Sequence, residues 1–326
     1  MDATPIWFMR QAGRALPRYR ESRAMRDMFS ILREPEAAAE ITAMPLEYFP
    51  VDAAVLYNDL VTPFIAAGLD LEMKPGIGPV VNDPIISAAD VDRLRPFDAR
   101  VELKYLLDQI RILVKRLNVP VLGFVGAPFT LCSYIVRGSR SKQQEEIKEF
   151  IYREPEAWHR LASFWADHLA DFGIAQYEAG AGAVQVFDSW AGSLSPEDYE
   201  MYVFEHSQRL IAKMQQAGVP IIHFATGNPA LLPLVAQAGG DCISVDWRLP
   251  IDTAWDIIGE DKSIQGNLDP VALLAGRDVA LAKAKDIMNR VAGRPGHIFN
   301  GGHGLLPGTD PDVVKAVVDF VHNYRA

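Results

Sequence analysis

The chain of 326 residues contains little cysteine, with only Cys132 and Cys242. The two lie far apart in apolar or glycine-rich surroundings, which favours buried, reduced thiols over a disulfide bond. Zinc sites are usually built from closely spaced cysteines and histidines, and these thiols do not provide that spacing. The sequence therefore predicts neither a disulfide bond nor a metal site.

Long apolar runs are also missing. The longest weakly polar stretch, 119–129, is about half of the roughly 20 residues that a membrane-spanning helix requires, and Pro120, Gly123 and Gly126 interrupt it. The first residues, MDATP, lack the basic start and apolar run of a secretory signal. We therefore expect a cytoplasmic protein without a membrane segment.

Positively charged residues are fewer than negatively charged ones, with 32 lysines and arginines against 42 aspartates and glutamates. The formal net charge of -10 and the pI near 5.2 argue against a nucleic-acid-binding surface. A small anionic partner would need a site that is locally basic.

Arginine is nevertheless concentrated near the start of the chain. Six arginines and no lysine occur between positions 10 and 26: Arg10, Arg14, Arg18, Arg20, Arg23 and Arg26. A guanidinium can hold a carboxylate or phosphate through two parallel hydrogen bonds, and it stays charged when partly desolvated. The last four are more simply explained as the solvated face of a helix. Arg10 and Arg14 differ, because the small residues Ala12 and Gly13 between them would let a ligand approach the backbone.

The order of apolar runs predicts the fold. Short, β-branched runs alternate with longer stretches of helical periodicity, a pattern typical of a parallel sheet. The seven clearest runs are 53–57, 119–125, 183–187, 219–224, 241–245, 263–265 and 297–299, and the eighth strand could be 6–9 or 77–81. No low-complexity linker divides the chain. We predict that residues 1–326 form one α/β domain, a (β/α)8 TIM barrel with its active-site cleft at the C-terminal ends of the strands.

Helix boundaries are indicated at three places. Helical spacing runs through 101–117 and ends before Pro120. A second helix is expected from Ser195 and Pro196 to just before Gly218, and a third from about Asp310. The Gly-x-Gly sequence at 76–78 indicates a turn rather than a nucleotide-binding loop.

Polar residues follow most of the predicted strands, as expected for a barrel whose strand ends converge on one mouth. They are Asp59, Asp188, Ser189, Asp246, Asn267, Asp269, Asn300 and His303, and His223 lies within the end of the fourth predicted strand. Some of them could instead begin the next helix as caps. We favour the cap explanation for Asp246, Asp269 and Asp310, and a place in the cleft for Asp59 and His303.

Five segments carry a resemblance to a known family. They are PIWFMRQAGRALPRYR (5–20), FPVDAAVLYNDLVTP (49–63), GAPFTLCSYIVRG (126–138), QVFDSWAGSLSP (185–196) and FNGGHGLLPGTDP (299–311). Together they resemble the uroporphyrinogen decarboxylases. The resemblance implies a homodimeric (β/α)8 barrel that removes carbon dioxide from the four acetate arms of uroporphyrinogen III and yields coproporphyrinogen III, without metal or organic cofactor.

The resemblance also implies roles for particular residues. Asp59 is expected to accept the pyrrole N–H groups and to stabilise the cationic pyrrole of the reaction, with Arg10 closest to the proton transfer. Because arginine is a poor proton donor, Arg10 more easily orients the departing acetate or relays a proton through water. A protonated His303 would suit an anionic arm. The implied substrate-binding residues are Arg10, Gln11, Ala12, Gly13, Arg14, Phe29, Asp59, Tyr134, Ser189 and His303.

Two alternative functions are open at this stage. A zinc-dependent methylcobamide methyltransferase could share this barrel, but its zinc requires a histidine with cysteines, and His223 in HFATGN has no cysteine nearby. A catalytically silent tetrapyrrole-binding protein would not require a central carboxylate such as Asp59. Both alternatives predict no decarboxylation.

Overall fold

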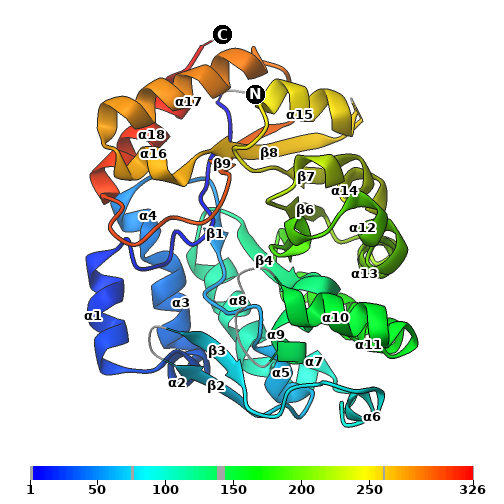
Figure 1. The fold of residues 1–326 in the computed structure, drawn as a ribbon. Helices are drawn as coiled ribbons and strands as arrows, with labels where there is room; N and C mark the ends of the chain where they lie inside the picture. Colours follow the sequence, from blue (N-terminus) through cyan, green and yellow to red (C-terminus); the bar gives the residue numbers. More distant parts are fainter. Residues whose placement is uncertain (1–2, 75–76, 138–143, 260, 326) are drawn as a thin grey trace.

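The computed structural model describes residues 3–74, 77–137, 144–259 and 261–325. Seven strands form one parallel sheet, and each pairs with the next in the chain. They are β1 (Ala54–Val55), β4 (Val121–Gly126), β5 (Ala183–Asp188), β6 (Ile221–Ala225), β7 (Cys242–Ser244), β8 (Ser263–Leu268) and β9 (His297–Gly301). This order, with helices in the connections, is that of the predicted TIM-type barrel (Figure 1).

The helices of the described residues surround this sheet. In chain order they are α1 (Pro17–Met25), α2 (Met28–Leu32), α3 (Pro35–Ala43), α4 (Pro45–Tyr48), α5 (Pro63–Ala66), α6 (Ala88–Val91), α7 (Ala99–Glu102), α8 (Lys104–Arg116), α9 (Pro128–Arg137), α10 (Glu145–Arg153), α11 (Pro155–Glu178), α12 (Pro196–Tyr202), α13 (Phe204–Gln216), α14 (Leu232–Ala238), α15 (Ile251–Ile258), α16 (Pro270–Leu274), α17 (Arg277–Val291) and α18 (Pro311–Asn323), with short 3-10 turns at Ala191–Ser193 and Pro229–Leu231. None of these helices is long and apolar enough to cross a membrane.

The eighth position of the barrel is filled by the N-terminal segment at Ile6. Ile6 forms an isolated parallel bridge with Phe299 of β9, and the N–H of Asp52, just before β1, donates to the Ile6 carbonyl at 2.8 Å. The predicted strand 6–9 pairs only at Ile6, since the Met9 N–H donates to the side chain of Asn300 in β9 and not to the backbone of that strand. The barrel is thus completed by backbone contacts on both sides of Ile6.

The alternative eighth strand, 77–81, was wrong. β3 (Gly78–Val81) pairs antiparallel with β2 (Leu71–Lys74) in a separate two-stranded sheet. The expected turn at 76–78 begins at Gly76, which lies outside the described residues. The apolar run at 77–81 did not distinguish an outlying hairpin from a barrel strand, although β3 is mostly half-buried whereas β4 of the barrel is buried throughout.

Several strands reach farther than predicted. Asn267 and Asn300, expected to follow their strands, are partners in register within β8 and β9. Asp188 likewise closes β5 opposite Ala225. In contrast, β1 is shorter than 53–57, and the N–H of Tyr57 donates to the Thr42 hydroxyl rather than to a strand. Asp188, Asn267 and Asn300 therefore lie on the strand ends themselves. Asp59, Ser189, Asp246 and His303 follow the strands, as predicted.

The predicted helices are present, but two of them are each divided by a break at one residue. The expected helix at 101–117 is divided at Leu103 into α7 and α8, and the one after Ser195 is divided at Val203 into α12 and α13. The start at Ser195 is confirmed, because its hydroxyl accepts from the Asp198 N–H at 3.1 Å. The single-residue breaks escaped prediction because the apolar spacing continues across them.

Of the three aspartates that were predicted to cap helices, two do so. Asp269 and Asp310 accept N–H groups of α16 and α18 at 2.9 Å, so both predicted caps are confirmed. The prediction for Asp246 was wrong, because this carboxylate caps no helix. It instead accepts from Thr226 and Gly227 after β6 and from Arg248. Tertiary contacts from a neighbouring strand end therefore decide the role of Asp246.

Candidate active site

The loop after β9 assembles the mouth of the barrel. A Cβ on Gly304 would lie 2.4 Å from Cδ of Arg10, and a Cβ on Gly302 would lie 2.7 Å from the Trp247 nitrogen. His303 sits between these two glycines. The GGHG sequence thus allows His303 to lie between the Arg10 loop on one side and the chain after β7 on the other.

The Arg10 loop is a tight turn. Arg10 has a φ of 58°, which is uncommon for a residue with a side chain, and its own side chain is exposed. A Cβ on Gly13 would lie 2.6 Å from the Arg10 carbonyl oxygen. Gly13 therefore permits the turn that presents the Arg10 guanidinium.

Gln11 holds this turn against the barrel. Its side chain is fully buried, donates to the Ala53 carbonyl at 2.8 Å and accepts from the Phe8 N–H at 3.0 Å. Its main-chain N–H donates to the Phe8 carbonyl, and its main-chain carbonyl accepts the Gly13 N–H. All of its polar groups therefore have partners inside the protein, and Gln11 anchors the turn that carries Arg10.

Asp59 follows β1 and is half-buried. Its carboxylate accepts the N–H of Val61 at 3.2 Å and caps no helix, since α5 begins later, at Pro63. Burial raises the pKa of Asp59, while the Val61 N–H and the charge of Arg10 lower it. The structure thus brings the two predicted catalytic residues within electrostatic reach of each other.

His303 is half-buried, and its Nδ1 accepts the N–H of Gly304 at 2.8 Å. Burial, followed by the positive charges of Arg10 and Arg248, lowers the pKa of His303 to about 4. In the free protein the neutral imidazole of His303 is therefore favoured at neutral pH. A neutral ring that accepts at Nδ1 carries its proton at Nε2, so His303 can offer a neutral hydrogen-bond donor.

The arginine-rich segment separates into two groups. Arg18 and Arg26 form ion pairs with Glu47 and Glu34, while Arg20 and Arg23 donate to main-chain carbonyls. Across the described ranges, neither Arg10 nor Arg14 forms an ion pair, and both are exposed. Arg10 and Arg14 therefore keep their guanidinium groups available for an anion.

The remaining predicted residues lie on other elements. Tyr134 of α9 packs edge-to-face on Trp190, with ring centroids 6.2 Å apart, and this brings it near the half-buried Ser189 that precedes Trp190. Phe29 of α2 is half-buried and packs against the main core. Ala12 is half-buried in the Arg10 loop.

Two polar features at the mouth were given no role from the sequence, although Asp188 was expected at the end of its strand. Asp188, which ends β5, is fully buried, accepts the Thr130 hydroxyl at 2.8 Å and has its pKa raised to about 7 by burial. Arg248 forms an ion pair with the buried carboxylate of Asp246. A basic residue two positions after a strand-end aspartate was the available signal for Arg248.

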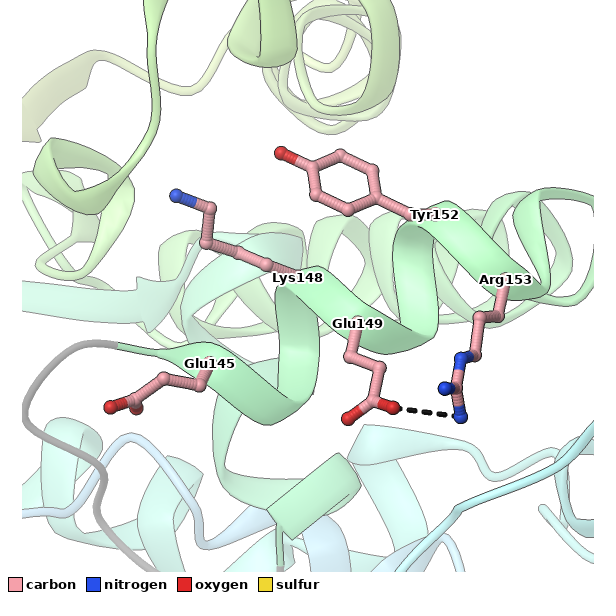
Figure 2. A pocket seen from close by; sticks show the side chains of 5 residues that line it. All are labelled: Glu145, Lys148, Glu149, Tyr152 and Arg153. Atoms are coloured by element: carbon pink, nitrogen blue, oxygen red, sulfur yellow. Dashed lines mark ion pairs between the residues drawn. The ribbon is translucent and has the colours of Figure 1, made fainter.

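Another surface groove belongs to a different region of the molecule. It is lined by α10 alone, through Glu145, Lys148, Glu149, Tyr152 and Arg153, with an ion pair between Glu149 and Arg153 (Figure 2). None of the predicted site residues contributes to it. We therefore place the candidate site at the strand ends and not in this groove.

Metal ligands are not gathered in the described part of the chain, which holds no group of three histidine, cysteine or acidic side chains. His223 is buried within β6, and its Nδ1 lies 3.2 Å from the Gly239 carbonyl oxygen. Cys132 and Cys242 are buried and free, so the predicted reduced thiols are confirmed.

Comparisons with solved structures agree on the fold. A methyltransferase from Methanosarcina mazei superposes with a TM-score of 0.77 at 20% identity, covering 98% of this chain and 94% of its own. A B12-independent methionine synthase from Shewanella gives a TM-score of 0.57 at 12% identity, covering 88% of this chain and 87% of its own. At these identities the likeness supports the barrel architecture alone.

Sequence comparisons are more specific. The family model described as "Uroporphyrinogen decarboxylase (URO-D)" matches residues 1–324. The chain is 48% identical over 324 residues to a uroporphyrinogen decarboxylase of Salinispora tropica, covering 99% of this chain and 87% of the relative. It is 45% identical over 329 residues to one of Chloroflexus aurantiacus, covering 99% and 93%. The chain belongs to the uroporphyrinogen decarboxylase family.

Proposed function

We propose that this protein is a carboxy-lyase that removes the four acetate carboxyl groups of uroporphyrinogen III in sequence. The products are coproporphyrinogen III and four molecules of carbon dioxide, a step of tetrapyrrole and haem biosynthesis that requires no metal or organic cofactor. Family membership supports the reaction. The single structural observation that carries it is Asp59, a desolvated carboxylate within electrostatic reach of Arg10 at the barrel mouth.

Asp59 is proposed as the catalytic carboxylate. Its oxygens would accept the pyrrole N–H groups of the macrocycle, and those donors would favour its ionised form against the effect of burial. When a pyrrole carbon is protonated, the ring becomes cationic, and a nearby fixed negative charge stabilises it more strongly in a desolvated site than in water. Loss of carbon dioxide from the acetate arm then returns its electron pair to the cationic ring and leaves an exocyclic methylene carbon. A proton adds to this carbon to complete the methyl group, and the proton first placed on the ring carbon leaves, which restores the pyrrole.

The surrounding groups are proposed to bind the acidic arms. Arg10 would orient the reacting acetate, and Arg14 would hold another carboxylate, since both guanidinium groups are exposed. His303 would donate from Nε2, Tyr134 and Ser189 would supply hydroxyl groups, and Phe29 would contribute an apolar surface. The turn formed by Gln11, Ala12 and Gly13 would fix the direction of Arg10.

We further propose that the chain acts as one domain spanning residues 1–326, as a homodimer, and in the cytoplasm. Family resemblance supports all three proposals. Sedimentation equilibrium of the purified protein should give twice the chain mass of 36.1 kDa, and a monomer mass at assay concentrations would refute the dimer.

Anaerobic incubation with uroporphyrinogen III tests the function directly. Chromatography should resolve intermediates with seven, six and five carboxyl groups and then a product with four. Turnover should be unaffected by a chelator. If the substrate binds but stays unchanged, a silent tetrapyrrole-binding protein is supported; if activity depends on zinc, the methyltransferase alternative regains support.

A further inference from the structure

Arg248 lies at the barrel mouth, in the segment that follows β7. Asn267 of β8 donates to the carbonyls of Asp246 at 2.9 Å and of Leu249 at 2.7 Å. These two hydrogen bonds fix the backbone on both sides of Arg248. The backbone position of Arg248 is therefore fixed by hydrogen bonds from a strand of the sheet.

The Arg248 guanidinium is held on one side and open on the other. Its Nη1 pairs with Asp246 and lies 3.4 Å from the Thr226 hydroxyl, and its Cζ lies 4.5 Å from the centroid of the Trp247 ring. The side chain is still 42% exposed. Within the described residues, Nε and Nη2 have no hydrogen-bond partner, which leaves two directed donors for a ligand.

Asp246 does not cancel the capacity of Arg248 to bind an anion, because the negative charge of Asp246 is shared among several hydrogen-bond donors. Beside Arg248 it accepts the Thr226 hydroxyl at 2.6 Å and the Gly227 N–H at 2.8 Å. The positive charge of Arg248 also extends to His303, whose pKa it helps to lower. Since Gly302 lies against Asp246 and Trp247, the His303 loop and Arg248 share one wall of the mouth.

We propose that Arg248 binds a carboxylate arm of the tetrapyrrole, as a third arginine of the site, with His303 between it and Arg10. This proposal rests on the proposed function. A macrocycle with eight carboxylates requires cationic donors on more than one side of the mouth, and Arg10 and Arg14 both come from a single loop. Arg248 would supply the donor on the side formed by β7 and β8.

Kinetics of the Arg248→Gln variant test this proposal. The KM for uroporphyrinogen III should rise about five- to tenfold, the effect of one charge-assisted hydrogen bond at a half-exposed site, while kcat stays within about twofold. The KM of Arg248→Lys should lie between those of the wild type and Arg248→Gln, because an ammonium keeps the positive charge but lacks the planar fork of a guanidinium. Arg290→Gln is the matched control, because Arg290 of α17 is 40% exposed and also pairs with aspartates, Asp252 and Asp286.

A second comparison separates substrate binding from the ion pair with Asp246. If Arg248 only neutralised Asp246, adding Asp246→Asn to Arg248→Gln would restore the KM; we expect the KM to stay raised. Binding of the oxidised analogue uroporphyrin, followed by tryptophan fluorescence, should weaken by the same factor. An active wild type with an unchanged KM in Arg248→Gln overturns this proposal alone, whereas an inactive wild type overturns the proposed function as well.

Discussion

At the scale of single residues, the negative charge of Asp59 is expected to have the largest effect on the rate of decarboxylation. Asp59→Asn keeps the size of the side chain and one acceptor oxygen but removes the negative charge that would stabilise a cationic pyrrole. We expect decarboxylation to fall by at least about a hundredfold, as for the loss of a group that stabilises transition-state charge.

The measurement is the initial rate of heptacarboxylate formation under anaerobic conditions. Asp92→Asn serves as the control, since Asp92 is an exposed surface carboxylate whose side chain is 76% accessible. Near-normal turnover by Asp59→Asn would refute the catalytic role, provided that the control retains full activity.

Arg14 and Arg18 form a natural pair for a binding test. Both are exposed, but Arg18 is engaged by Glu47 whereas Arg14 has no ion-pair partner among the described residues. Arg14→Ala should raise the KM about tenfold with little change in kcat, because it removes a charge-assisted contact made in both the ground and transition states. Arg18→Ala should leave the KM unchanged. Equal KM values for the two variants would argue against a carboxylate contact at Arg14.

At the scale of elements, the loop after β9 controls the direction of Arg10. In Gly304→Ala the new Cβ would meet Cδ and Cγ of Arg10 at 2.4 and 2.6 Å, so the side chain must move. We expect kcat/KM to drop about ten- to hundredfold, the effect of misplacing a reacting group by about an ångström, with a nearly unchanged Tm.

Gly302→Ala provides the contrast. There the new Cβ would meet backbone atoms of Asp246 and Trp247 at 2.7 to 3.0 Å, and a backbone cannot give way as a long side chain can. Thermal denaturation should therefore show a clear loss of Tm in Gly302→Ala. A Gly304→Ala variant with normal kcat/KM would show that the position of Arg10 is not critical.

At the scale of the whole molecule, burial of neutral histidines links stability to pH. Burial lowers the pKa values of His206, His223, His297 and His303 to about 4, below the ordinary value of 6.5. Between pH 6.5 and 4 the unfolded chain binds more protons than the native one, so these groups reduce the free energy of unfolding as the pH falls.

Two carboxyl groups with raised pKa values act in the opposite direction. The raised pKa values of Asp59 and Asp188, the latter about 7, mean that the native state takes up protons there first as the pH falls. Because four histidines oppose two carboxyl groups, we expect the urea midpoint to decrease from pH 7 to pH 4.5. A midpoint that is constant or higher at pH 4.5 would contradict this balance.

The sequence alone determined the parallel barrel and the gathering of polar residues at its strand ends, because the succession of strand and helix patterns and the helix caps are local properties of the chain. It left open which segment completes the barrel, and only the contacts of Ile6 with Phe299 and Asp52 decided this. The tertiary structure also decided the neutral state of His303, the role of Asp246 and the place of Arg248. Each of these depends on burial and on charges brought together from strand ends far apart in the sequence, and local spacing does not encode such proximity.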